Sequence, residues 1–130
     1  MGQRKLVSIV YVLIGSFSGG LSRFLLSTWL NRFQLNGFPV GTLSVNCLGS
    51  ILLGAFVSYE IVIEGHFNGK SLLEIGFLGG MTTFSTFSLE SYDLIQKNKF
   101  GYALGYMIGS PIFGVIGFWA ILILNGGILK

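Results

Sequence analysis

The third apolar segment of the chain contains its most distinctive run of residues. That run is Gly79-Gly80-Met81-Thr82-Thr83-Phe84-Ser85-Thr86-Phe87-Ser88. Adjacent glycines followed by threonines form a poor helix, because glycine loses much backbone entropy and threonine loses rotamer freedom. We expect a helix break at Gly79–Thr83, where irregular backbone must be buried or line a cavity and its freed carbonyl groups could coordinate a cation. A flexible kink without a ligand is the alternative.

Two aromatic residues follow this expected break. Phe84 and Phe87 are three residues apart and share one helix face. An aromatic ring has a positive edge, which can face a small anion where a carboxylate would repel it. The spacing alone favours packing or lipid contact. Ser85, Thr86 and Ser88 add hydroxyl donors that a helix with a packing role alone does not need.

The second apolar segment contains an unusual amide, Asn46. In hydrocarbon an amide must find a partner, which can be a facing helix, a water-filled cavity or a passing ion. Thr42 lies four residues earlier and shares a helix face with Asn46 and Gly49, so a polar stripe is expected. Asn46 as interhelical glue and Asn46 as a ligand both stay open on this pattern.

Hydroxyl groups recur in the fourth apolar segment. Tyr106 and Ser110 are four residues apart and could continue a track of donors along one face. Pro111 follows and frees a backbone carbonyl one turn earlier, which predicts a local distortion. Tyr106 as an interfacial anchor is the alternative, although Tyr102 suits that role better.

Ionisable residues inside apolar segments are rare here. Arg23 lies within the first segment and either snorkels to the interface or places a positive charge near an anion entrance. Glu90 and Asp93 lie in the last two turns of the third segment. With no carboxylate at the centre of a segment, we expect no carboxylate relay for protons or cations.

The composition of the chain predicts that these residues lie on helices that span a lipid bilayer. The 130 residues are 52% hydrophobic and 10% charged, whereas soluble domains are about 25% charged. Charges and turn residues delimit four expected transmembrane helices: Lys5–Leu30, Gly41–Ile63, Ser71–Gln96 and Phe100–Leu124. Their short connections predict one all-α membrane domain over residues 1–130. The net charge of +3 is too small and scattered to indicate nucleic-acid binding.

Glycine spacing and charge balance predict how the helices assemble. Small residues recur every four positions, which predicts close helix packing and a subunit interface: Gly15 and Gly19, Ser50 and Gly54, Gly76 and Gly80, and Gly101, Gly105 and Gly109. Basic residues divide nearly evenly between the two ends: Arg4, Lys5, Lys70 and Lys130 against Arg32, Lys97 and Lys99. So weak a bias leads us to hypothesise that the chain inserts both ways and pairs antiparallel.

Three motifs together resemble the Fluc (CrcB) fluoride channel family. They are Gly19-Gly20-x-x-Arg23-Phe24, Gly41-Thr42-Leu43-x-x-Asn46-x-x-Gly49-Ser50 and Gly79-Gly80-x-Thr82-Thr83-Phe84-Ser85-Thr86-Phe87-Ser88. The resemblance implies a dual-topology homodimer in a prokaryotic plasma (inner) membrane, with two pathways for passive fluoride export that lower its toxic concentration in the cytoplasm. No enzymatic chemistry is implied.

The resemblance also implies roles for individual residues. A central structural sodium ion would be held by the backbone carbonyls of Gly79 and Thr82. The ring edges of Phe84 and Phe87 would line the fluoride path, with Asn46 donating a hydrogen bond nearby. Further polar residues of the track would be Ser85, Thr86, Tyr106, Ser110 and Thr42, and Arg23 would be a vestibule charge.

Two other classes of protein fit parts of the pattern. A small antiparallel multidrug exporter also has four short helices, but it needs a membrane-embedded glutamate where the first segment here has Arg23. A non-transporting assembly subunit could be held together by the glycine faces. The hydroxyl-rich run after Gly80 counts against that role.

Overall fold

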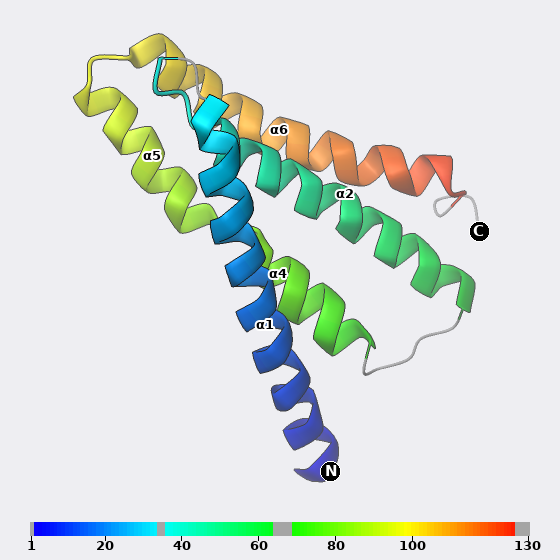
Figure 1. The fold of residues 1–130 in the computed structure, drawn as a ribbon. Coiled ribbons are helices and arrows are strands. Elements are labelled where there is room, and N and C mark those ends of the chain that lie inside the picture. Colours follow the sequence, from blue (N-terminus) through cyan, green and yellow to red (C-terminus); the bar gives the residue numbers. More distant parts are fainter. Residues whose placement is uncertain (1, 34–35, 64–68, 127–130) are drawn as a thin grey trace.

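The regular structure of the chain is helical. The computed structural model describes residues 2–33, 36–63 and 69–126. In chain order its elements are α1 (Gly2–Leu30), the short 3₁₀ helix η1 (Asn31–Phe33), α2 (Val40–Ile63), the π-helix η2 (Lys70–Leu78), α4 (Gly79–Met81), α5 (Phe84–Gln96) and α6 (Phe100–Leu124) (Figure 1).

Four segments of the described residues are long and apolar enough to cross a membrane. These candidate spans are Lys5–Phe33, Val40–Tyr59, Lys70–Gln96 and Phe100–Leu124. The four predicted transmembrane helices are thus confirmed, with boundaries that differ by a few residues. The third span is composite, because η2, α4 and α5 follow one another along it.

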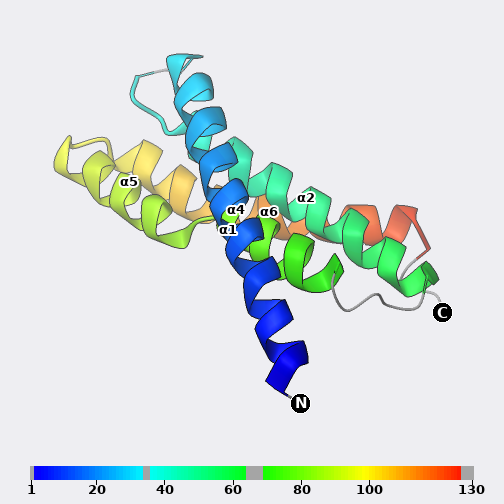
Figure 2. The same cartoon turned by 60° about the horizontal axis from the view of Figure 1, so that its bottom comes forward.

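The spans form two pairs of helices that run parallel within each pair. α1 lies against η2 and α4, and α2 lies against α6. Figures 1 and 2 show α2 and α6 side by side, with α1 crossing them. Since consecutive spans alternate in direction, the loop before α2 and the turn between α5 and α6 meet at one end of the molecule. There the Lys99 ammonium donates to the carbonyl oxygen of Asn36.

Glycines allow both pairs to approach closely. A Cβ atom at Gly80 would lie 2.8 Å from the Ser16 carbonyl oxygen, and one at Gly54 would lie 2.6 Å from that of Phe118. The predicted close packing is therefore confirmed for these two glycine faces. A Cβ at Gly101 or Gly105, on the predicted face in α6, would meet no atom of the described residues within 4 Å, so these two glycines do not serve packing among those residues.

The backbone between α4 and α5 leaves helical geometry at two threonines. Thr82 has φ −80° and ψ 147°, and Thr83 has φ −145° and ψ 123°, so both residues are extended. Gly79, in contrast, is helical, with φ −64° and ψ −36°. Gly80 also stays within α4, where its missing side chain lets the backbone contact Ser16 of α1. Gly80 thus serves helix packing, and the irregular backbone is narrower than the predicted Gly79–Thr83.

Candidate functional site

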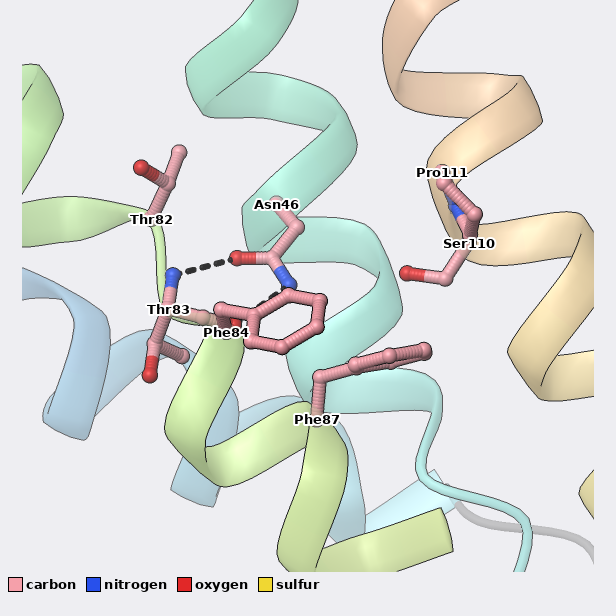
Figure 3. Close-up of a pocket in the computed structure, with 7 residues that line it drawn as sticks. All are labelled: Asn46, Thr82, Thr83, Phe84, Phe87, Ser110 and Pro111. Carbon is pink, nitrogen blue, oxygen red and sulfur yellow. Dashed lines mark hydrogen bonds between the residues drawn. The ribbon is translucent and has the colours of Figure 1, made fainter.

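The Asn46 side chain of α2 holds the extended backbone at Thr83. The Thr83 N–H donates to Asn46 Oδ1 at 2.8 Å, and Asn46 Nδ2 donates to the Thr83 carbonyl oxygen at 3.2 Å (Figure 3). One amide therefore pairs with both backbone polar groups of a residue whose backbone is extended. This pairing gives Asn46 the role of glue between α2 and the third span.

The side chain of Thr83 starts α5. Its Oγ1 accepts the N–H of Thr86 at 3.2 Å, which is the bond of a helix N-cap. In a continuous helix the N–H groups of Thr83 and Thr86 would bond to the carbonyls of Gly79 and Thr82, four residues earlier. Here they donate to Asn46 Oδ1 and Thr83 Oγ1 instead. The carbonyls of Gly79 and Thr82 lose their usual helical partners in this way.

A cavity of about 240 Å³ opens beside this bridge. Its walls come from α2, the extended segment, α5 and α6, and Figure 3 shows its lining residues, which are Asn46, Thr82, Thr83, Phe84, Phe87, Ser110 and Pro111. The rings of Phe84 and Phe87 lie 5.4 Å apart and are tilted by 42°. The structure thus brings together an amide, a hydroxyl and two aromatic rings from three spans, all of them residues singled out from the sequence.

A second group of polar side chains lies next to Phe87. The ring of Tyr106 is 5.0 Å from that of Phe87 and is 0% exposed. The Tyr106 hydroxyl donates to Glu90 Oε2 at 2.7 Å, and Thr42 Oγ1 donates to Glu90 Oε1 at 2.7 Å. Thr42 and Tyr106 therefore meet at a carboxyl group and not at the wall of the 240 Å³ cavity.

Glu90 is the member of this group that sequence reasoning did not select. It lies near the end of the third span, where a carboxylate is usually solvated. The available signal was its spacing, because Glu90 follows Phe87 by three residues and so shares its helix face. Glu90 also borders a polar cavity of about 150 Å³ at the loop end of the molecule, together with Asn31, Gly37, Pro39, Asp93, Leu94 and Lys97.

The remaining predicted residues lie around these two groups. Ser85 is exposed, and its hydroxyl lies 3.2 Å from Thr83 Oγ1. Thr83 Oγ1 also donates to Thr86 Oγ1 at 3.1 Å. Ser88 donates to the carbonyl of Phe84 in its own helix. Arg23 lies on α1, outside the lining of the 240 Å³ cavity, and its buried Nε atom has no hydrogen-bond partner among the residues that the structure describes.

These observations define a multi-pass membrane protein of four candidate spans whose polar side chains gather around an extended segment in the third. The model of the family "CrcB-like protein, Camphor Resistance (CrcB)" matches residues 10–122. The fluoride-specific ion channel FluC of Hahella chejuensis is 45% identical over 105 residues, which cover 80% of this chain and 83% of that protein. The FluC of Parabacteroides distasonis is 35% identical over 124 residues, which cover 95% and 97%. The chain therefore belongs to the CrcB/FluC fluoride channel family, whose members are channels and not enzymes.

The hydrogen bonds to Glu90 predict a contribution of Tyr106 to stability. Tyr106→Phe removes the donor to Glu90 Oε2, an oxygen of a half-buried side chain. We expect a loss of about 0.5–1.5 kcal/mol in the free energy of unfolding, the usual net contribution of one hydrogen bond. Thermal unfolding in detergent, followed by circular dichroism, measures the change.

Tyr102→Phe is the matched control for this substitution. The Tyr102 hydroxyl accepts an exposed hydrogen bond from Asn36 Nδ2 at 3.3 Å. Its loss should change stability by no more than about 0.5 kcal/mol, as is usual at exposed positions. Equal destabilisation by the two substitutions would contradict a special role for the bond between Tyr106 and Glu90.

Proposed function

We propose that this chain forms a fluoride-selective channel that lets fluoride leave the cytoplasm passively across the plasma membrane, which lowers its toxic concentration there. The observation that carries the proposal is the composition of the 240 Å³ cavity, where the Asn46 amide, the Ser110 hydroxyl and the rings of Phe84 and Phe87 converge. The fluoride-specific channels that are similar to this chain support the choice of ion.

The chemistry of these groups suits a small anion. Fluoride is strongly hydrated, so a pathway must offer donors that replace its water, as the carbonyls of a potassium filter replace the hydration shell of a cation. The Asn46 amide nitrogen has two hydrogens and donates one to Thr83, which leaves the other for an ion. The positive ring edges of Phe84 and Phe87 add attraction without a fixed charge.

The polar groups beyond Phe87 suggest how this path continues. Phe87, at the wall of the 240 Å³ cavity, contacts Tyr106, whose hydroxyl and that of Thr42 both bind Glu90. Glu90 in turn borders the 150 Å³ cavity at the loop end of the molecule. A passing anion would compete with Glu90 for the two hydroxyl hydrogens. Ser85 and Thr86 extend the donors on the α5 side, and Arg23 would act as a vestibule charge.

Two features support a homodimer in antiparallel orientation. The Phe84 side chain is 79% exposed although it lines the cavity, and Thr82 and Thr83 are only half-buried. Irregular backbone at membrane depth must be covered by protein or line a cavity. A second copy of the chain would supply that cover for a break at mid-membrane. The even division of basic residues between the two ends permits the two copies to insert in opposite directions.

A sodium ion is the cofactor that fits the extended segment. The carbonyls of Gly79 and Thr82 are relieved of their helical donors, because Thr83 and Thr86 direct their N–H groups elsewhere. Hard cations prefer such oxygen ligands. Two copies would bring two sets of these carbonyls to one axis, and a bound sodium ion would offset their mutual repulsion and add a positive potential between the two anion paths.

Fluoride efflux from liposomes tests the proposed function. Liposomes that contain the purified protein and internal fluoride should release it once a potassium ionophore compensates the charge, whereas chloride release should stay slow. Asn46→Asp keeps the acceptor for the Thr83 N–H but removes both amide donors and adds a negative charge, so its fluoride efflux should collapse. Ion-selective electrodes measure both anions.

Two results of this experiment would count against the proposal. Absence of fluoride efflux with the wild-type dimer would reject the channel function. A wild-type rate in Asn46→Asp would reject the part of Asn46 in conduction and leave it as glue alone. Purification of the variant as a dimer is the control for folding.

Substitution of the aromatic residues separates conduction from packing. If Phe84 and Phe87 only pack, Phe→Ile at either site should cost less than about 1.5 kcal/mol, as volume-conserving changes do, and leave efflux unchanged. If ring edges attract the ion, efflux should fall steeply, because isoleucine has no quadrupole. Methionine, which is polarisable, should retain more efflux than isoleucine. Near-normal efflux in both Ile variants would remove the rings from the mechanism.

Removal of sodium tests the proposed cation site. The dimer should melt at a higher temperature in sodium chloride than in choline chloride at the same ionic strength. Binding to the folded state alone stabilises by about 2.7 kcal/mol at a ligand concentration one hundred times the dissociation constant. A rise that saturates with sodium concentration supports a specific site, whereas identical melting curves in the two salts would refute it.

A further inference from the structure

Phe38, in the loop just before α2, contacts the ring of Tyr106. The two ring centroids are 5.7 Å apart and the planes meet at 79°, which is an edge-on contact. Phe38 also contacts Tyr102 edge-on, with centroids 6.0 Å apart. It packs against the buried cluster of Leu94, Ala103 and Tyr106. A loop residue thus touches the buried tyrosine whose hydroxyl is bound to Glu90.

The loop that carries Phe38 is fixed to the first turn of α6. Asn36 and Gly37 have positive φ values of 53° and 79°, so the chain turns sharply there. Asn36 Nδ2 donates to the Tyr102 hydroxyl at 3.3 Å, and the Lys99 ammonium donates to the Asn36 carbonyl. The N–H of Val40 donates to the Phe38 carbonyl at 2.8 Å. The backbone around Phe38 is therefore tied to the start of α6 through Asn36 and to the first residue of α2 through its own carbonyl.

The contacts of Tyr106 determine where its hydroxyl lies. Phe38 and Phe87 both contact its fully buried ring, at centroid distances of 5.7 and 5.0 Å. Rotation about the Cα–Cβ bond of Tyr106 would swing its hydroxyl away from Glu90, whereas rotation about the Cβ–Cγ bond only turns the ring in place. Rings packed against Tyr106 oppose the first rotation and so hold the hydroxyl at the carboxyl group. Phe87 lines the 240 Å³ cavity, whereas Phe38 is outside its lining.

We propose that Phe38 is a positioning residue for the ion path, which holds the Tyr106 ring so that its hydroxyl stays at Glu90. This inference rests on the proposed function, because Tyr106 matters for conduction only if the path runs past it. Phe38 itself borders neither the 240 Å³ cavity nor the 150 Å³ cavity. It acts through the shape and edge-on contact of its ring, and a flexible aliphatic side chain of similar volume would let Tyr106 reorient.

Fluoride efflux by Phe38 variants tests this role. Phe38→Leu keeps apolar volume but loses the ring, and Phe38→Tyr keeps the ring. We expect Phe38→Leu to slow efflux about three- to tenfold, as the loss of one edge-on aromatic contact allows, and Phe38→Tyr to conduct at nearly the wild-type rate. Phe38→Met replaces the Leu variant if that one does not purify as a dimer.

Phe118→Leu is the matched control. Phe118 is also half-buried and also makes an edge-on contact, with Trp119 at 6.1 Å and 89°. It lines neither the 240 Å³ cavity nor the 150 Å³ cavity, and it makes none of the hydrogen bonds to Glu90. Its replacement should lower the melting temperature as much as Phe38→Leu does and leave efflux unchanged. Equal slowing of efflux by the two substitutions would overturn the proposal.

A double variant tests whether Phe38 acts through Tyr106. If it does, Phe38→Leu combined with Tyr106→Phe should conduct no more slowly than Tyr106→Phe alone, because the hydroxyl to be positioned is already gone. Additive slowing, a Phe38→Leu rate equal to that of the wild type, or equal loss in Phe38→Leu and Phe38→Tyr would overturn the inference. If the wild-type protein released no fluoride from liposomes, the proposed function itself would be rejected.

Discussion

The two hydrogen bonds between the Asn46 amide and the backbone of Thr83 are the interaction on which the rest of the site depends. A peptide unit outside a helix costs several kcal/mol in hydrocarbon if its polar groups stay unpaired. Asn46 pairs both groups of Thr83 at once. The third span can therefore change from helix to extended backbone and back within two residues. Without this amide, the Gly-Gly-Met-Thr-Thr run would have to form a continuous helix or find water.

The packing of α2 against α6 carries this local arrangement across the molecule. Ser50 lies beside Gly114 and Gly54 beside Phe118, so the two helices advance together by four residues. The same step in the other direction pairs Asn46 with Ser110 and Thr42 with Tyr106, in agreement with the cavity lining and the bonds to Glu90. The close contacts at Gly54 and Gly114 set the register between α2 and α6. This register places the polar residues of α2 opposite those of α6.

The sequence predicted the spans and singled out most residues that line the 240 Å³ cavity, because period and polarity are strong signals in hydrocarbon. It did not predict that Gly79 and Gly80 stay helical, since that depends on the contact between Gly80 and Ser16 of another span. Glu90 was not selected because its two donors, Thr42 and Tyr106, are distant in sequence. Phe38 carries no local signal in a loop, and its contact with Tyr106 appears only when the loop is placed over α6.

The two interpretations of Asn46 left open by the sequence are compatible for a physical reason. A primary amide has two donor hydrogens and an acceptor oxygen with two lone pairs, and the bridge to Thr83 uses one hydrogen and one acceptor position. The bonds by which Asn46 links α2 to the third span also fix the plane of its amide. They thereby fix the direction of the second hydrogen on Asn46 Nδ2, beside the 240 Å³ cavity. A donor fixed in this way loses less entropy when it binds an ion than a freely rotating one. Structural support and the proposed ion recognition would therefore depend on the same side chain, and the rigidity that the bonds to Thr83 impose would favour binding of the ion.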